Sequence, residues 1–348
     1  MAISTSELKY ELPVELAARQ PIELTSSRRD GTRLIVGFKN SQKIIDDVFT
    51  NFTNYINSGD LLILNNSKTI SPIFYAYSDK YGEVKFHIKT KTDLGYVSYI
   101  RIREDLKDKI IGENFIVTDE IEVSVNKRTE GDEFLCSFNC SEEDLYNYLL
   151  INGEAVKSIY TKKKWSIDYY QNEVANKLGS FENPAASRHF TNKMLNILRE
   201  KGVRIAYITL NCASVDTKIF EDIIEKHVVF KEYYEIPEET VRLIQETKLN
   251  GNKVFAVGTT VIRTLESCNY DNFRITSPLK NYTDLYIHPG HNFKVTDALI
   301  TNFHGSMTSR LALSAAAIGV DNIMNLYKHA IEEKYLFYEF GDANLLFM

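Results

Sequence analysis

The stretch that most constrains the fold lies between residues 254 and 265. An apolar run, Val254–Val257, stops at Gly258 and is followed by apolar residues at helical spacing. This pattern predicts a short buried strand, a glycine turn and a helix, with the hydroxyl of Thr259 or Thr260 accepting a backbone N–H as the N-cap. Free N–H groups at such a helix start bind an anion or a ribose hydroxyl. The sequence therefore predicts a ligand-binding turn at Gly258.

Two further apolar runs are expected to end near the same place. Residues 285–287 and 298–301 are strand-like, and each is followed within a few residues by histidine and glycine. In open α/β sheets, polar groups that follow several neighbouring strands line the crevice where ligands bind. We therefore expect these strand ends to contribute to one site.

Composition is typical of a soluble globular protein. Of the 348 residues, 44% are hydrophobic and 25% charged, and no window of 18 residues is continuously apolar. The N-terminus lacks the basic start and apolar core of a signal peptide, so a cytoplasmic protein without membrane attachment is expected. The four cysteines are too few and too scattered for a disulfide scaffold. The net charge of −6 argues against a protein that coats nucleic acid, although a local basic patch would suffice for an enzyme that acts on one.

The pattern of hydrophobic residues divides the chain into two units. Residues 71–147 contain runs with a period of two separated by turn-like clusters, which predicts a small antiparallel β-barrel. Residues 1–70 and 148–348 alternate between strand-like and helical patterns, which predicts one α/β domain with a largely parallel sheet. The expected fold is an α/β domain interrupted by an inserted barrel. Within the α/β domain we expect strands at 34–36, 61–64 and 204–210, and helices at 47–56, 191–201, 238–249, 311–318 and 321–334.

Titratable residues at the ends of apolar segments are candidates for acid–base chemistry. The chain has no Gly-x-Gly-x-x-Gly motif and no Walker loop, so the usual signatures for dinucleotides and nucleoside triphosphates are absent. General acid–base catalysis needs titratable groups at loop ends. The candidates are His189, His227, His304, Glu232, Glu266 and Asp342. His288 and His291 flank a turn without an acidic or cysteine partner at metal spacing, so no metal is expected.

Seven motifs together resemble one known family. They are Leu-Pro-x-Glu-Leu-x-Ala at 12–18, Arg-Asp-x-x-Arg-Leu at 29–34, Gly-Asp-Leu-Leu-x-Leu-Asn at 59–65, Pro-x-Ala-x-x-His-Phe-Thr at 184–191, Ala-Val-Gly-Thr-Thr-x-x-Arg-Thr-Leu-Glu-Ser at 256–267, Leu-Ile-Thr-Asn-Phe-His at 299–304, and Phe-Gly-Asp-Ala at 340–343. Over nearly the whole chain the sequence resembles the S-adenosylmethionine:tRNA ribosyltransferase-isomerase family of queuosine biosynthesis. The 256–267 match is long and specific.

The resemblance implies a fold and a reaction. The fold would be a Rossmann-like α/β domain with an inserted β-barrel. The enzyme would be a transferase and isomerase that uses S-adenosylmethionine as a ribosyl-donor substrate and tRNA as its partner. It would move the ribosyl moiety onto the 7-aminomethyl-7-deazaguanine of tRNA to give epoxyqueuosine, with release of adenine and methionine.

The resemblance also implies roles for residues in the shared motifs. His189 or His304 would be the general base or acid, and Glu266 or Asp342 an orienting carboxylate. The amides near Gly258, Thr259 and Thr260 would hold polar groups of the donor. The other residues that these motifs assign to substrate binding are Arg33, Asn65, Thr191, Arg263 and Asn302.

Several positions depart from the family pattern. The family run Asn-Asp-Thr-Arg-Val-Ile-Pro-Ala-Arg has Asn66 in place of its acid and Ile73 in place of its last arginine. Family histidines are replaced at Asn211 and Phe230, and the family's Leu-Pro-Lys-Ser-Thr is Gly-Ser-Met-Thr-Ser at 305–309. These changes leave two alternatives open. One is a diverged paralogue with a different acceptor, and the other is a non-catalytic protein that binds tRNA or a nucleoside.

Overall fold

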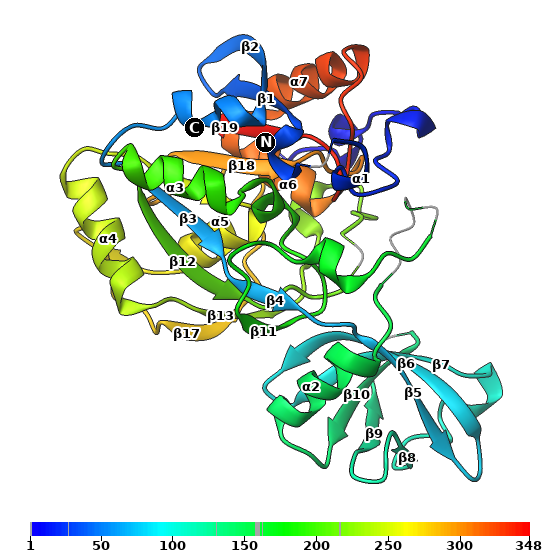
Figure 1. The fold of residues 1–348 in the computed structure, drawn as a ribbon. Helices are drawn as coiled ribbons and strands as arrows, with labels where there is room; N and C mark the ends of the chain where they lie inside the picture. Colours follow the sequence, from blue (N-terminus) through cyan, green and yellow to red (C-terminus); the bar gives the residue numbers. More distant parts are fainter. Residues whose placement is uncertain (1, 27, 130, 157–160, 162, 216) are drawn as a thin grey trace.

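The structure is a computed structural model, and it describes residues 2–26, 28–129, 131–156, 161, 163–215 and 217–348. It contains an α/β unit, which carries both chain termini, and a small barrel that lies below it in Figure 1. None of the helices in these residues is long and apolar enough to cross a membrane.

A nine-stranded mixed sheet forms the centre of the α/β unit. Its order is β17 (Lys280–Thr283), β13 (Glu232–Glu235), β12 (Arg204–Leu210), β3 (Leu61–Asn65), β14 (Val254–Val257), β18 (Ala298–Asn302), β19 (Ala343–Phe347), β1 (Arg33–Phe38) and β2 (Ser41–Val48). The four central strands, β12, β3, β14 and β18, run parallel, and β1 is parallel to β19. The expectation of a largely parallel sheet is wrong outside the four central strands, because β13, β17, β19 and β2 each run antiparallel to a neighbour.

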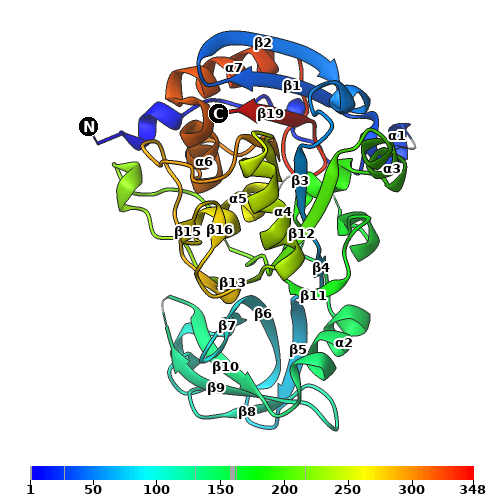
Figure 2. The same ribbon diagram turned by 90° about the vertical axis from the view of Figure 1, so that its left-hand side faces the viewer.

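Helices cover both faces of this sheet, and strand β3 shows why. Leu61 and Ile63 belong to a core cluster that also contains apolar residues of α4 (Glu238–Leu249), α5 (Thr259–Glu266), α6 (Ser309–Ile318) and α7 (Val320–Glu332). Leu62 and Leu64 belong to a second cluster, with α3 (Asn192–Glu200), on the other face (Figure 2). Side chains alternate across a strand, so a strand that is buried on both faces reads as a continuous apolar run. The predicted strands and helices at these positions are confirmed.

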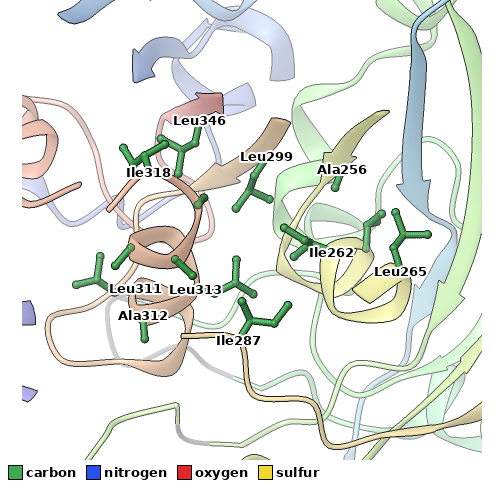
Figure 3. Packing of buried hydrophobic residues seen from close by; sticks show 14 of the residues in the cluster. Ala256, Ile262, Leu265, Ile287, Leu299, Leu311, Ala312, Leu313, Ile318 and Leu346 are labelled. Carbon is green, nitrogen blue, oxygen red and sulfur yellow. The ribbon is translucent and has the colours of Figure 1, made fainter. Parts of the chain in front are cut away.

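The segment expected to be a strand at residues 285–287 packs differently. The strand in this region is β17, which ends at Thr283, and residues 284–288 have no regular structure. Ile287 is 1% exposed and lies between α5 and α6 (Figure 3). The apolar run therefore reflects a side chain that fills the space between two helices, and the prediction of a strand there was wrong.

The predicted helix at residues 47–56 is also wrong. Strand β2 continues to Val48, and a 3₁₀ helix follows at Phe49–Asn54. Phe49 and Phe52 are fully buried and stack with their ring centroids 5.6 Å apart. Side chains three residues apart eclipse one another in a 3₁₀ helix, which places both rings on the same side. The amphipathic pattern is present, but the three-residue spacing of Phe49 and Phe52 corresponds to a 3₁₀ helix and not to an α-helix.

The inserted unit is a closed antiparallel barrel. Its strand order is β10 (Glu133–Phe138), β7 (Gly95–Arg101), β6 (Gly82–Thr92), β5 (Ile73–Ser78), β8 (Asn114–Ile116) and β9 (Glu122–Arg128). Helix α2 (Glu142–Asn152) follows, and its Leu145, Tyr146 and Leu149 are part of the barrel's core cluster. The expected domain boundary between residues 147 and 148 falls within α2. Because this helix packs on the barrel, we place the end of the inserted unit after Asn152.

Shorter elements complete the chain. Strand β4 (Ser67–Thr69) pairs with β11 (Lys177–Ser180) where the chain passes between the α/β unit and the barrel, and β15 (Tyr270–Asp271) pairs with β16 (Arg274–Ile275). Helix α1 is a single turn, Glu23–Ser26.

Candidate active site

A cavity of about 760 Å³ opens at the carboxyl ends of the central parallel strands. Segments that follow β12, β14 and β18 line it, and His87 and Lys89 of barrel strand β6 close another side. The barrel is held there by hydrogen bonds such as Ser214 N–H to Lys89 O (2.7 Å). Parallel α/β sheets bind ligands at this edge, and the cavity lies within the range of roughly 300–1,000 Å³ that accommodates drug-sized molecules.

The start of helix α5 forms one wall of the cavity. Gly258 has φ +93° and is itself the N-cap, so the expectation that Thr259 or Thr260 caps the helix was wrong. A residue with a side chain would be strained at this φ. All three residues line the cavity, and the buried Thr260 hydroxyl has no hydrogen-bond partner in the described part of the chain. The first N–H groups of a helix also lack partners within it, so this wall presents hydrogen-bond donors to a ligand.

The end of strand β18 forms a second wall. His304 and Asn302 line the cavity, and His304 Nε2 lies 2.8 Å from the Thr301 hydroxyl. Burial, with a smaller effect from the charge of Arg310, lowers the pKa of His304 to about 3. The imidazole is therefore neutral at pH 7, and one ring nitrogen is unprotonated.

His189 lies behind this wall and is absent from the cavity lining. Its Nδ1 is 3.0 Å from the Thr32 hydroxyl, and its Nε2 is 3.2 Å from Asn302 Nδ2. Burial, reinforced by the charge of Arg188, lowers the pKa of His189 to about 3. A neutral ring that accepts from the Asn302 amide directs the amide oxygen elsewhere, and that oxygen has no partner among the described residues. His189 therefore orients Asn302.

Two ion pairs also line the cavity. Arg263 pairs with Glu232 and donates from Nε to Leu285 O (2.9 Å). Arg310, in the first turn of α6, pairs with Glu182, which lies between β11 and the 3₁₀ turn Ala185–His189. Arg263 and Glu232 were predicted from the sequence, whereas Glu182 and Arg310 were not. One sequence feature could have indicated Arg310: it lies at the start of a predicted helix, where the helix dipole disfavours a cation.

The two carboxylates that the motifs implied lie outside the cavity lining. Glu266 accepts hydrogen bonds from Lys294 N–H (2.7 Å) and the Thr296 hydroxyl (2.8 Å). Burial alone would raise the pKa of Glu266, but these bonds and the nearby His291 bring it below its ordinary value. Asp342 accepts from the N–H groups of Arg33 and Leu336, both at 2.7 Å. Both carboxylates hold backbone segments together.

Three implied substrate-binding residues also make contacts within the protein rather than lining the cavity. Thr191 caps α3 and donates to Asp30 (3.1 Å). The Arg33 guanidinium lies 3.7 Å over the ring centre of Tyr335. Asn65 is fully buried and exchanges hydrogen bonds with the Leu210 backbone (2.9 and 3.1 Å). The six implied residues that line the cavity together are Gly258, Thr259, Thr260, Arg263, Asn302 and His304.

Comparison with known proteins identifies the family. A family model described as a queuosine biosynthesis protein matches residues 5–346. The chain belongs to the queuosine biosynthesis protein family.

Relatives within this family span the whole chain. The S-adenosylmethionine:tRNA ribosyltransferase-isomerase of Francisella tularensis subsp. tularensis (strain SCHU S4 / Schu 4) is 33% identical over 352 residues, which cover 100% of both chains. The enzyme of the same name from Thermotoga maritima is 32% identical over 346 residues, which cover 99% of this chain and 100% of the relative. The crystal structure of the S-adenosylmethionine tRNA ribosyltransferase from Thermotoga maritima has a TM-score of 0.55 and 30% identity, over 98% of this chain and 100% of that chain. The Rossmann-like α/β domain with an inserted barrel is confirmed.

Some of the residues that depart from the family pattern line the cavity, and others do not. Asn66, Ile73 and Asn211 are not part of the cavity lining. Phe230 lines the cavity, as do four of the five replaced residues at 305–309. Within the cavity lining, this member of the queuosine biosynthesis family therefore departs from the family pattern beyond the end of β18 and at Phe230, while the wall at the start of α5 follows the pattern.

Replacing Glu266 with alanine is expected to destabilise this queuosine biosynthesis protein by about 2–4 kcal/mol. The change leaves the buried Thr296 hydroxyl and the Lys294 N–H without the carboxylate that accepts their hydrogen bonds. Urea denaturation at pH 7 measures the effect. Glu239→Ala, on the exposed surface of α4, serves as the control and should change stability by less than about 0.5 kcal/mol. A Glu266→Ala protein as stable as the parent would contradict the bracing role.

Proposed function

We propose that this protein is an S-adenosylmethionine-dependent tRNA ribosyltransferase-isomerase that converts 7-aminomethyl-7-deazaguanine in tRNA to epoxyqueuosine. The observation that carries the proposal is the preserved start of α5, which opens into the cavity at the carboxyl ends of the parallel strands. The relatives that are similar to this chain over their full length are named for this activity. A cytoplasmic location, where tRNA is available, accords with this proposal.

The α5 and β18 walls would hold the nucleoside part of the donor. The N–H groups of Thr259 and Thr260 and the Thr260 hydroxyl offer hydrogen bonds to ribose or adenine. The Asn302 amide oxygen, held in place through His189, accepts one from a ribose hydroxyl. Two of these groups, the Thr260 hydroxyl and the Asn302 amide oxygen, are buried and have no hydrogen-bond partner among the described residues. A buried polar group without a partner costs free energy that a bound nucleoside would recover.

The reaction needs a proton acceptor beside the sulfonium. A bond forms between the aminomethyl nitrogen of the base and the ribosyl skeleton. The bonds from that skeleton to adenine and to the methionine sulfur break. Methionine leaves with the electron pair of the C–S bond, adenine leaves with a proton, and the alkylated amine loses one. The carbon that has lost its proton beside the sulfonium forms the carbon–carbon bond that closes the cyclopentane, and an oxygen of the ribosyl skeleton replaces the sulfur to give the epoxide. We assign the removal of the proton on the carbon beside the sulfonium to His304, the neutral imidazole in the cavity wall. His189 acts through Asn302 as a positioning residue, and Glu266 and Asp342 brace the surrounding backbone.

The experiment that tests this function uses purified protein, S-adenosylmethionine and tRNA that carries 7-aminomethyl-7-deazaguanine. Chromatography measures released adenine and methionine, and mass spectrometry of digested tRNA identifies the new nucleoside. We expect adenine, methionine and epoxyqueuosine in equal amounts, and none with the same tRNA carrying guanine at that position.

Other outcomes separate the alternatives. Folded protein that releases no adenine would contradict the proposal. Adenine release with a different acceptor would identify a diverged paralogue, and tRNA binding without any release would identify a non-catalytic binding protein.

A further inference from the structure

Arg310 occupies a position that helix stability does not explain. It is the second residue of α6, whose N-cap is Thr308. A cation in the first turn meets the positive end of the helix dipole, which opposes it by roughly 0.3–1 kcal/mol. The side chain nevertheless lines the cavity and is 37% exposed. A cation that is disfavoured by its helix and still reaches a ligand cavity points to a role in binding.

The partner of Arg310 leaves the guanidinium only partly occupied. Its Nη1 and Nη2 lie 3.3 and 2.9 Å from the two carboxylate oxygens of Glu182. A guanidinium has five N–H donors, so three remain for a ligand. The Glu182 side chain is 32% exposed and also lines the cavity. An ion pair this exposed contributes little to stability, typically about 0–1 kcal/mol.

The other arginine in the cavity wall differs in this respect. Arg263 and Glu232 are only 15% and 9% exposed. Arg263 also donates to the carbonyl oxygens of Leu285 and Thr283. Its donors are therefore largely committed to the protein, whereas the pair of Glu182 and Arg310 presents one negative and one positive group side by side to the cavity.

Such a pair matches one end of the proposed donor. The amino-acid end of S-adenosylmethionine carries an ammonium and a carboxylate on the same carbon. An arginine binds a carboxylate through two parallel hydrogen bonds, and a carboxylate binds an ammonium. We propose, on the basis of the function proposed above, that Arg310 and Glu182 bind the carboxylate and the ammonium of the donor's amino-acid end. They set the specificity of the cavity for a donor that carries this zwitterion.

A neighbouring group fits the same assignment. Asn183 follows Glu182 in the cavity wall, and its buried Nδ2 has no hydrogen-bond partner within the described residues. The Asn183 amide can therefore donate a second hydrogen bond to the ligand carboxylate that Arg310 binds. The family run that is replaced at 305–309 contains a lysine, and here no lysine or arginine precedes Arg310 in that segment. Arg310 supplies a cation to this part of the wall, next to Lys218, whose Nζ donates to Ser306 O (3.1 Å).

Two ligands with the same uncharged sulfur test the proposal. S-Adenosylhomocysteine carries the amino-acid end, and 5′-methylthioadenosine lacks it. Isothermal titration calorimetry measures both dissociation constants for the parent and for Arg310→Met. We expect the variant to bind S-adenosylhomocysteine about 10- to 100-fold more weakly, the effect of losing charge-assisted hydrogen bonds, and to bind 5′-methylthioadenosine as the parent does.

Further variants separate recognition from structural support. Arg310→Lys keeps the charge without the planar fork and should weaken S-adenosylhomocysteine binding to an intermediate degree. The double variant Glu182→Arg with Arg310→Glu retains an ion pair but reverses it relative to the anchored nucleoside. We expect it to keep the parent's melting temperature while still binding S-adenosylhomocysteine at least about tenfold more weakly.

The possible failures are distinguishable. If the parent binds neither ligand, the proposed function fails. If the parent binds both, and Arg310→Met binds S-adenosylhomocysteine as tightly as the parent does, only the assignment of Arg310 and Glu182 is overturned. A variant that weakens both ligands equally would show a structural role. A rise in the KM for tRNA with unchanged S-adenosylhomocysteine binding would assign Arg310 to a tRNA phosphate and overturn the proposal.

Discussion

Replacing His304 with alanine is expected to lower turnover of S-adenosylmethionine with modified tRNA by about 100-fold or more. The cause is the loss of the neutral imidazole in the cavity wall, because a positioned acid or base contributes roughly 10²–10⁴ to a rate. The KM for S-adenosylmethionine should change little if His304 acts mainly in the transition state. Adenine release under saturating substrates measures kcat, and the initial slope at low donor concentration measures kcat/KM.

Two further variants make this result specific. His329 lies outside the cavity and pairs with Asp46 at 2.8 Å, so His329→Ala is a control for the loss of one imidazole and should retain the parent's rate. Thr301→Val removes the hydroxyl beside His304 Nε2 and should lower kcat by a smaller factor, because the ring loses its orienting partner. Unchanged turnover in a folded His304→Ala protein would remove His304 from the proton transfer.

The second large effect expected is a loss of stability in acid. The pKa of His189 is lowered from 6.5 to about 3 by burial in the folded protein. Between these values the unfolded chain binds a proton that the folded protein does not. The free energy of unfolding therefore decreases as pH falls from 6.5 toward 3, by up to about 1.4 kcal/mol per pH unit for one histidine. His87 shifts in the same direction, mainly through burial.

Urea denaturation at unit steps from pH 4 to pH 8 measures this dependence, and His189→Gln isolates one histidine. Glutamine can still hydrogen-bond to Thr32 and Asn302, but it does not titrate. The variant should be less stable than the parent at pH 7, and its stability should fall less steeply between pH 6 and pH 4. Carboxylates that also titrate in this range affect parent and variant alike. Parallel curves for the two proteins would show that His189 is not held neutral by the fold.

Much of the fold was predictable because apolar spacing is a local property. Continuous apolar runs identified β3 and β14, and the change to a period of two identified the barrel. The errors came where the same local signal has two physical causes. Ile287 is apolar because it lies between two helices, and Phe49 and Phe52 are spaced for a 3₁₀ turn. Neither distinction can be read from a short window, because each depends on what packs against the segment.

The candidate site divides in the same way. The family, the strand–glycine–helix unit at Gly258 and the histidine after β18 were predictable without a structure, because each depends on contiguous motifs. Only the tertiary structure placed His189 behind Asn302, which is 113 residues away, and brought Arg310 to Glu182 across 128 residues. It also placed Glu266 and Asp342 outside the cavity lining. A motif lists residues that occur together, but whether a side chain faces a ligand or braces the backbone depends on long-range packing, and that is decided only when the chain is folded.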